Sequence, residues 1–214
     1  MSLDIHVGPL SRVAAGQWSD AGPRATDERR RAVQAWRDAL NRRLGDRLAI
    51  PLDWDETDQA PTFSGRPGWH GLAALVLWAA YAEHPAVRPP TRLPEELDSD
   101  PILLRTRSDG FRSRYAHLVR NVELWLPQAF DFVVEGDDVD GRRVVLGSAV
   151  LLRRQLEDLN GATWKARPRA IAGWAGRELP DTASVEENAR HAFAVLLDLA
   201  DRAVEHRLPM KVGY

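Results

Sequence analysis

Residues 72–84 read LAALVLWAAYAEH, and this stretch decides the fold. It is apolar on nearly every face of a helix, which is typical of a helix that runs through a protein core. Pro85 follows directly and ends it, because proline removes a backbone donor and clashes with the preceding turn. The apolar run Leu72–Ala82 is about half as long as a membrane-spanning helix requires. We therefore predict a buried central helix over residues 72–84.

A long C-terminal helix is predicted over residues 184–207. Ser184 and Glu187 have the spacing of a capping box, in which each side chain satisfies a backbone N–H at the helix start. Apolar residues then recur on one stripe as far as Leu208-Pro209. Other helices are expected to begin at three capping residues: Thr26, Asp100 and Ser148.

The strands are short and irregularly separated, so the sequence predicts an α+β fold rather than a doubly wound sheet. The clearest signal is a hairpin of Phe130–Val134 with Arg143–Leu146 around Asp140-Gly141. Further strands are expected at Leu3–Val7, Leu48–Leu52 (an edge strand), Val122–Leu126 and Met210–Tyr214. Residues 161–183 are expected to be irregular. We predict one domain over 1–214, with a small, mostly antiparallel sheet packed against several helices.

Composition limits the function classes. The chain has no cysteine, which excludes disulfides, thiolate nucleophiles and zinc fingers. The net charge of −2 gives no overall electrostatic argument for nucleic acid or an anionic membrane. The first residues lack the basic and apolar regions of a secretory signal. We therefore expect a cytoplasmic protein without a cofactor, and we expect neither nucleic acid nor a membrane as a partner.

The segment that leads into the central helix is the candidate functional site. It holds the densest group of acids, with Trp54 among them, and Trp69 lies where the helix begins. An acidic segment that carries aromatic rings suits contact with a basic protein. Indole rings dominate interface energetics when they fill a pocket. The predicted partner-binding residues are Asp53, Trp54, Asp55, Glu56, Asp58, Phe63, Trp69 and His70.

The same acids suggest a metal site as an alternative, since Ca²⁺ and Mg²⁺ prefer carboxylate ligands. The EF-hand pattern fails, because Asp58 occupies the position of its glycine and Ser64 that of its bidentate glutamate. A solvated acidic loop is the simpler interpretation, and we assign no metal site. A small hydrolase that uses this loop and His70 stays open as the alternative function.

Other polar groups have structural explanations. Asp137, Asp138 and Asp140 lie between two apolar runs and indicate a hairpin turn. Gly147-Ser148 lacks the second glycine of a nucleophile elbow, so Ser148 is expected to cap a helix. The arginines between Arg29 and Arg47 are expected to form a solvated helix face. Histidines other than His70 are expected at the surface or at caps.

Several stretches resemble a family of uncharacterised bacterial proteins that start MSLDxxVG and have no established activity. These anchors extend from residue 1 to about residue 164. They are Met1–Gly8, Arg66–Gly71 running into Leu75–Tyr81, Trp125–Pro127 with Phe130, and Leu146–Ser148 leading to Leu159–Asn160. The resemblance implies a bacterial cytoplasmic single domain and carries no catalytic residue.

Two functional hypotheses follow. The first is a non-enzymatic interaction protein, most concretely an immunity protein that neutralises a basic toxin through residues 53–70. The second is a small hydrolase or metal-binding enzyme at the same loop. The sequence leaves the oligomeric state open.

Overall fold

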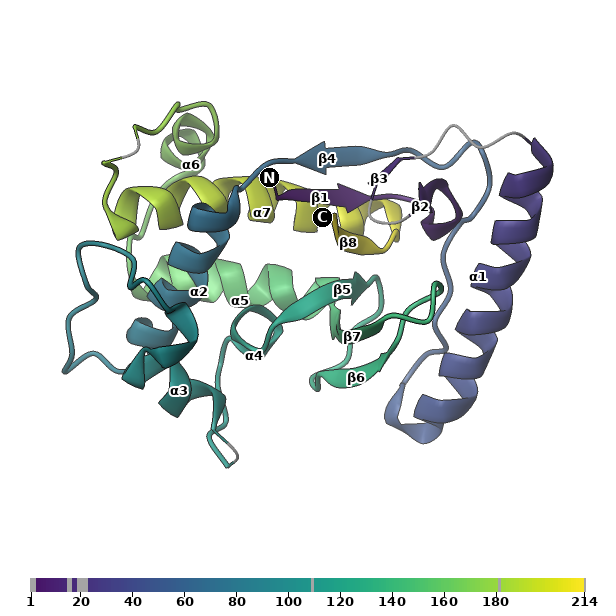
Figure 1. Ribbon diagram of the computed structural model, residues 1–214, viewed down its shortest axis with the longest axis horizontal. Helices are drawn as coiled ribbons and strands as arrows, with labels where there is room; N and C mark the ends of the chain where they lie inside the picture. The colour runs from purple at the N-terminus through teal and green to yellow at the C-terminus, as the bar shows by residue number, and fades with distance from the viewer. Residues whose placement is uncertain (1–2, 15–16, 19–22, 109, 181, 214) are drawn as a thin grey trace.

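The computed structural model describes residues 3–14, 17–18, 23–108, 110–180 and 182–213. It is an α+β fold, as predicted, built on a six-stranded sheet of order β4-β1-β8-β5-β7-β6 (Figure 1). One neighbouring pair, β5–β7, is parallel and the other pairs are antiparallel. The strands are β1 (Asp4–Val7), β4 (Phe63–Gly65), β5 (Val122–Leu126), β6 (Val134–Asp137), β7 (Arg143–Ser148) and β8 (Met210–Gly213). A separate two-stranded sheet pairs β2 (Val13–Ala14) with β3 (Gln17–Trp18).

Seven α-helices are assigned in the described residues: α1 (Pro23–Leu44), α2 (Trp69–Ala82), α3 (Pro101–Arg107), α4 (Ala116–Val119), α5 (Ala149–Ala162), α6 (Pro168–Ala175) and α7 (Val185–His206). Three 3₁₀ turns accompany them: η1 (Leu10–Arg12), η2 (Gly45–Arg47) and η3 (Leu97–Ser99). None of the helices described is long and apolar enough to cross a membrane.

The two helices predicted most strongly are present. The central helix α2 lies in the main core, where Leu75, Leu77 and Ala79 have no exposed surface. The capping box of Ser184 and Glu187 starts α7. Packing between α2 and α7 is close, since a Cβ on Gly71 would lie 3.2 Å from the Cβ of Ala192.

Several local predictions differ from the structure. Residues 48–52 form no strand, and Ile50 is exposed. The helix α1 begins at Pro23 rather than at Thr26, and residues 168–175, expected to be irregular, form α6. The predicted hairpin is present as β6–β7, although its first strand starts at Val134. The last strand is confirmed over Met210–Gly213, while Tyr214 lies outside the described residues.

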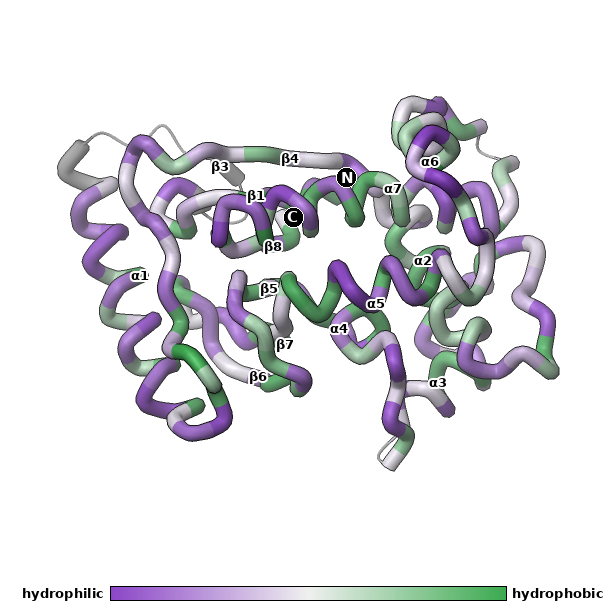
Figure 2. The backbone as a smooth tube through the Cα atoms, turned by 180° about the vertical axis from the view of Figure 1, so that it is seen from behind, coloured by the Kyte–Doolittle hydropathy of each residue, from purple (hydrophilic) through white to green (hydrophobic). Residues whose placement is uncertain are grey.

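The sheet buries apolar side chains on both faces. Helices α5 and α7 pack on one face, with α2 packed against them, and Ile5, Trp125 and Met210 on this face belong to the main core. The other face carries a smaller core in which Leu124 and Leu146 pack with Val33 of α1. Most of α1 is hydrophilic (Figure 2), so only a narrow stripe of this helix packs against the smaller core. The segment 48–60 runs alongside α1 in Figure 1, and this pairing builds the candidate site.

Candidate functional site

The residues from Leu52 to Glu56 alternate between buried and exposed positions. Leu52, Trp54 and Glu56 are buried, whereas Asp53 and Asp55 are exposed. Alternation with period two is the pattern of an extended chain with one face against a core. The segment therefore turns its apolar side toward the smaller core and its carboxylates toward solvent.

Side chains of α1 hold this segment through its main chain. Asn41 donates to the carbonyl oxygen of Leu52 (3.0 Å) and accepts from its N–H (2.7 Å). Arg37 Nη1 donates to the carbonyl oxygen of Trp54 (2.7 Å), and Arg30 Nε donates to that of Glu56 (2.7 Å). Asn41 and Arg37 are about one helix turn apart, a rise of about 5.4 Å, which is close to the two-residue step of about 6.6 Å in an extended chain. Arg30 lies about two turns before Arg37 and bonds the next of these carbonyls. Arginines expected to be solvated therefore fix the backbone of the acidic segment.

Glu56 and Trp54 do not face outward, which corrects the sequence-based expectation. The Glu56 carboxylate accepts from the N–H groups of Leu10 and Ser11, both at 2.9 Å, and from Trp54 Nε1. The Trp54 ring lies edge-on to Trp36, with centroids 6.2 Å apart. We remove both residues from the partner-binding set, because an enclosed side chain has no surface to offer a partner.

Three aspartates of the segment stay at the surface, and we call Asp53, Asp55 and Asp58 the acidic row. The side chains of Asp53 and Asp58 are 82% and 74% exposed, although they pair with Arg37 and Arg30, each at 2.9 Å. Arg37 is buried, but both carboxylates face water, and ion pairs in contact with solvent contribute about 0–1 kcal/mol. A partner's cations can therefore compete for these carboxylates.

Phe63, Trp69 and His70 lie away from the acidic row. Phe63 is in β4, where its ring stacks on His206 with centroids 5.1 Å apart. Trp69 and His70 are exposed in the first turn of α2, beyond the far end of β4 (Figure 1). The structure thus divides the predicted set into a row beside α1 and a separate exposed pair. Trp125, by contrast, is enclosed in the main core.

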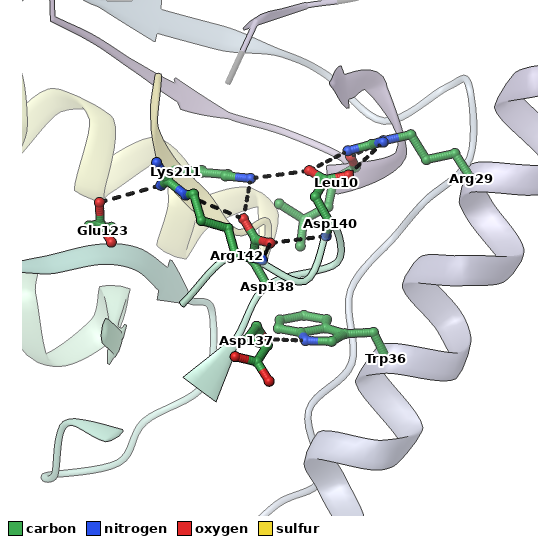
Figure 3. A network of polar contacts seen from close by, with 9 residues as sticks. All are labelled: Leu10, Arg29, Trp36, Glu123, Asp137, Asp138, Asp140, Arg142 and Lys211. Carbon is green, nitrogen blue, oxygen red and sulfur yellow. Dashed lines mark hydrogen bonds and ion pairs between the residues drawn. The ribbon is translucent and has the colours of Figure 1, made fainter. Parts of the chain in front are cut away.

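A second group of acids lies in the β6–β7 turn, and its carboxylates are engaged within the chain (Figure 3). Lys211 Nζ donates to Asp138 Oδ2 (3.0 Å), and both side chains are buried. Burial alone raises the pKa of Asp138, but hydrogen bonds from Lys211 and from the Arg142 and Asp140 backbones lower it overall. Arg29 pairs with Asp140 (3.0 Å). This network joins the turn to α1 and β8, which confirms its expected structural role.

Trp36 and Arg43 of α1 also cover the outer edge of the sheet. Trp36 Nε1 donates to the carbonyl oxygen of Asp137 (2.7 Å) (Figure 3), and Arg43 donates to that of Glu135 (2.7 Å). Both acceptors belong to the edge strand β6, whose free groups would otherwise invite another strand. The position of α1, and with it that of the acidic row, is therefore fixed from two sides.

The geometry offers no support for a metal at the loop. Across the described residues, no group of three or more His, Asp or Glu side chains is placed to hold a metal ion. Asp53 and Asp55 point outward from alternate positions, and His70 lies on another element. The roles of Arg30, Arg37 and Lys211 could not be read from the sequence, because a charged side chain that binds a distant carbonyl or carboxylate looks there like a solvated one.

Comparison with known proteins supplies one match. The model of a family described as “Putative DNA-mimic protein” matches residues 1–212. No curated protein and no solved structure matches the chain. The family description corrects the expectation that nucleic acid plays no part, because a DNA mimic engages proteins that bind DNA. Net charge gave no sign of this, because it describes the whole chain and not the local distribution of its acids.

Proposed function

Because this chain belongs to the family described as “Putative DNA-mimic protein”, we propose that it binds a DNA-binding protein in place of DNA. The family description indicates a role in protein interaction. The acidic row is the observation that carries the proposal for this surface. In an extended chain, Asp53 and Asp55 lie about 7 Å apart, so the row presents closely spaced negative charges, as the phosphates of a DNA strand do.

Rigidity of the row supports the proposal. The bonds from Asn41, Arg37 and Arg30 to alternate carbonyls fix the backbone from which the aspartates project. A surface that is ordered before binding avoids the entropy cost of ordering it on contact. The carboxylates would also attract a basic DNA-binding surface and speed the encounter. Net charge stays near zero because arginines elsewhere balance these acids.

An immunity protein remains a narrower prediction within this proposal. The family description names mimicry of DNA and names no toxin. The proposal needs only that the partner's contact surface is one that binds phosphates.

The test is competition with DNA. Labelled duplex DNA is bound to each of a panel of purified architectural and helix-turn-helix proteins, and fluorescence anisotropy follows its release as the unlabelled chain is added. We expect release from at least one protein, weakening as salt rises. Replacing all three aspartates of the row, D53N/D55N/D58N, should weaken competition about tenfold or more, corresponding to about 1.4 kcal/mol.

A matched variant separates the row from overall charge. E95Q/E96Q/E205Q removes the same number of exposed carboxylates elsewhere and should compete like the wild-type chain. If it loses competition as strongly as the row variant does, the row is not the contact surface. Failure to release DNA from every protein, even at low salt, would contradict DNA mimicry by this chain.

A further inference from the structure

A cleft beside the start of α2 has a composition unlike that of the acidic row. Its cavity has a volume of about 710 Å³ and is lined by the segment before α2, the first turn of α2, the chain after α6, and α7. A second cavity of about 510 Å³ shares Leu3 and Trp69 with it. Both volumes are in the range of small-molecule sites, about 300–1,000 Å³. We call the larger one the Trp69 cleft.

Trp69 gives the cleft an aromatic wall. Its side chain is 45% exposed, although it lines both cavities. Gly68 precedes it with a φ of 70° and has no side chain to cover the ring. An indole at the mouth of a cavity is suited to stacking on a flat aromatic ring. The exposure of Trp69 therefore points to a ligand with a ring.

Two arginines give the cleft a cationic wall. Arg66 contacts Asp4 through Nε (3.0 Å), and Arg177 contacts Glu187 through Nη2 (3.6 Å). Each guanidinium carries five N–H donors, so each keeps donors for a further anion. Both side chains are largely exposed. Among the described residues that line this cavity, Glu178 is the one acid. Asp4 and Glu187 pair with the arginines from outside this lining, so the remaining guanidinium donors are what the cleft offers an anion.

His191 joins the two walls of the cleft. Its Nδ1 lies 3.1 Å from the carbonyl oxygen of Trp174 at the end of α6. Its Nε2 lies 3.4 Å from the carbonyl oxygen of Arg66. A neutral imidazole donates through one nitrogen only, so the ring bonds one of these carbonyls and lies beside the other. His191 therefore sits between the segment that carries Arg66 and the helix that precedes Arg177.

We propose that the Trp69 cleft binds a small anion that carries an aromatic ring, of the nucleoside monophosphate class. Trp69 stacks on the base, and Arg66 and Arg177 bind the phosphate, since arginine matches phosphate oxygens with paired donors. The site is independent of the acidic row, and its occupancy gives the chain a ligand other than its protein partner.

Isothermal titration calorimetry tests the proposal with AMP, adenosine and inorganic phosphate as probes. AMP should bind more tightly than either of its parts. Trp69→Ala should weaken AMP about tenfold, the equivalent of one lost base stack, and leave phosphate binding unchanged. R66Q/R177Q should weaken both AMP and phosphate. Arg88→Gln, an exposed arginine elsewhere, is the matched control and should change neither.

The outcomes are distinct. Absence of AMP binding at millimolar concentration overturns the proposal. AMP binding that neither Trp69→Ala nor R66Q/R177Q changes places the nucleotide elsewhere and overturns it too. If AMP binds no more tightly than phosphate and Trp69→Ala does not change its affinity, the base does not stack on Trp69 and that part of the proposal is overturned. Circular dichroism of each variant confirms that the fold is retained.

Discussion

At the scale of single residues, His117 joins more parts of the molecule than its place in the sequence indicates. The ring Nδ1 of His117 accepts from the backbone N–H of Ser148 (2.9 Å). The backbone N–H of His117 donates to Gln155 Oε1 (2.9 Å). Its carbonyl accepts from Trp125 Nε1 (2.8 Å). The side chain is fully enclosed, which contradicts the expected surface or cap position. Burial lowers the pKa of His117 from 6.5 to about 4, outweighing the opposite effect of Asp131.

This lowered pKa predicts a loss of stability in mild acid. The unfolded chain takes up a proton on His117 below about pH 6.5, whereas the folded chain resists it until about pH 4. The stabilising effect is therefore complete above pH 6.5 and is lost as the pH falls to 4. It amounts to about 3 kcal/mol, from about 1.4 kcal/mol per pKa unit. Urea unfolding between pH 7 and 4.5 measures it.

A variant isolates the contribution of His117 from those of other titrating groups. His117→Gln should flatten the dependence of unfolding free energy on pH in this window, whatever its effect at pH 7. His206→Gln, at an exposed histidine, should leave the slope as it is. Equal slopes for His117→Gln and the wild-type chain would rule out the buried neutral imidazole as the cause.

At the scale of elements, the helix α1 determines the shape of a segment that forms no strand. The carbonyl groups of residues 52, 54 and 56 accept from side chains of α1 rather than from a neighbouring strand. Leu52 and Trp54 fill the smaller core, and Asp53 and Asp55 are left outside. Leu52 and Trp54 are thus held both by apolar burial and by the bonds to their carbonyl groups. Together these interactions orient the carboxylates of Asp53 and Asp55 toward solvent.

This arrangement predicts different effects for two neighbouring residues. Trp54→Ala should destabilise the protein by about 3–5 kcal/mol, because it removes a buried indole and leaves a cavity. Asp55→Asn should change stability by less than about 0.5 kcal/mol, because the side chain is exposed, and should weaken binding to the partner. Urea unfolding measures the stability change of each variant, and competition with DNA measures how far Asp55→Asn weakens binding to the partner. A stable Trp54→Ala variant would contradict the enclosed position of this ring.

At the scale of the whole molecule, polar contacts link three elements that are far apart in the sequence: the strand β8, the β6–β7 turn and the helix α1. Lys211 lies in the central strand β8, between Met210 and Val212, which face the main core. It reaches Asp138 in the β6–β7 turn, and Arg29 of α1 bonds the neighbouring Asp140 (Figure 3). The C-terminal strand, the hairpin and α1 therefore depend on one charged network.

Removing one partner of the buried Lys211–Asp138 pair is expected to lower the free energy of unfolding. Lys211→Met leaves the buried Asp138 carboxylate with Arg142 Nε, at 4.0 Å, as its remaining cation, and should destabilise the protein by about 3 kcal/mol. K211M/D138N should recover part of this loss, because the amide that replaces the carboxylate is neutral and keeps an oxygen to accept from the Asp140 and Arg142 backbones. A double-mutant cycle from urea unfolding measures the coupling. Additive losses would mean that the two side chains contribute independently.

Features that depend on neighbours in the sequence were predicted well. Ser148, Ser184 and Asp100 cap helices as expected, because a cap bonds N–H groups two or three residues away. The central helix α2 follows from apolar residues on all its faces, which have no stable place except a core. The aspartates of the β6–β7 turn were also recognised, since turn chemistry is local.

Features that depend on residues far apart were not predicted. Asp53-Trp54-Asp55 is compatible with either outward face, and the sequence alone leaves open whether the indole is exposed or wedged against the core. The choice was made by Arg37 and Asn41, which bind the backbone of a segment more than ten residues away, and by the Glu56 carboxylate on Leu10 and Ser11. The sequence by itself determined the α+β class, the caps and the presence of an acidic segment. Only the tertiary structure decided which of its side chains meet water, because burial is set by contacts across the chain and not along it.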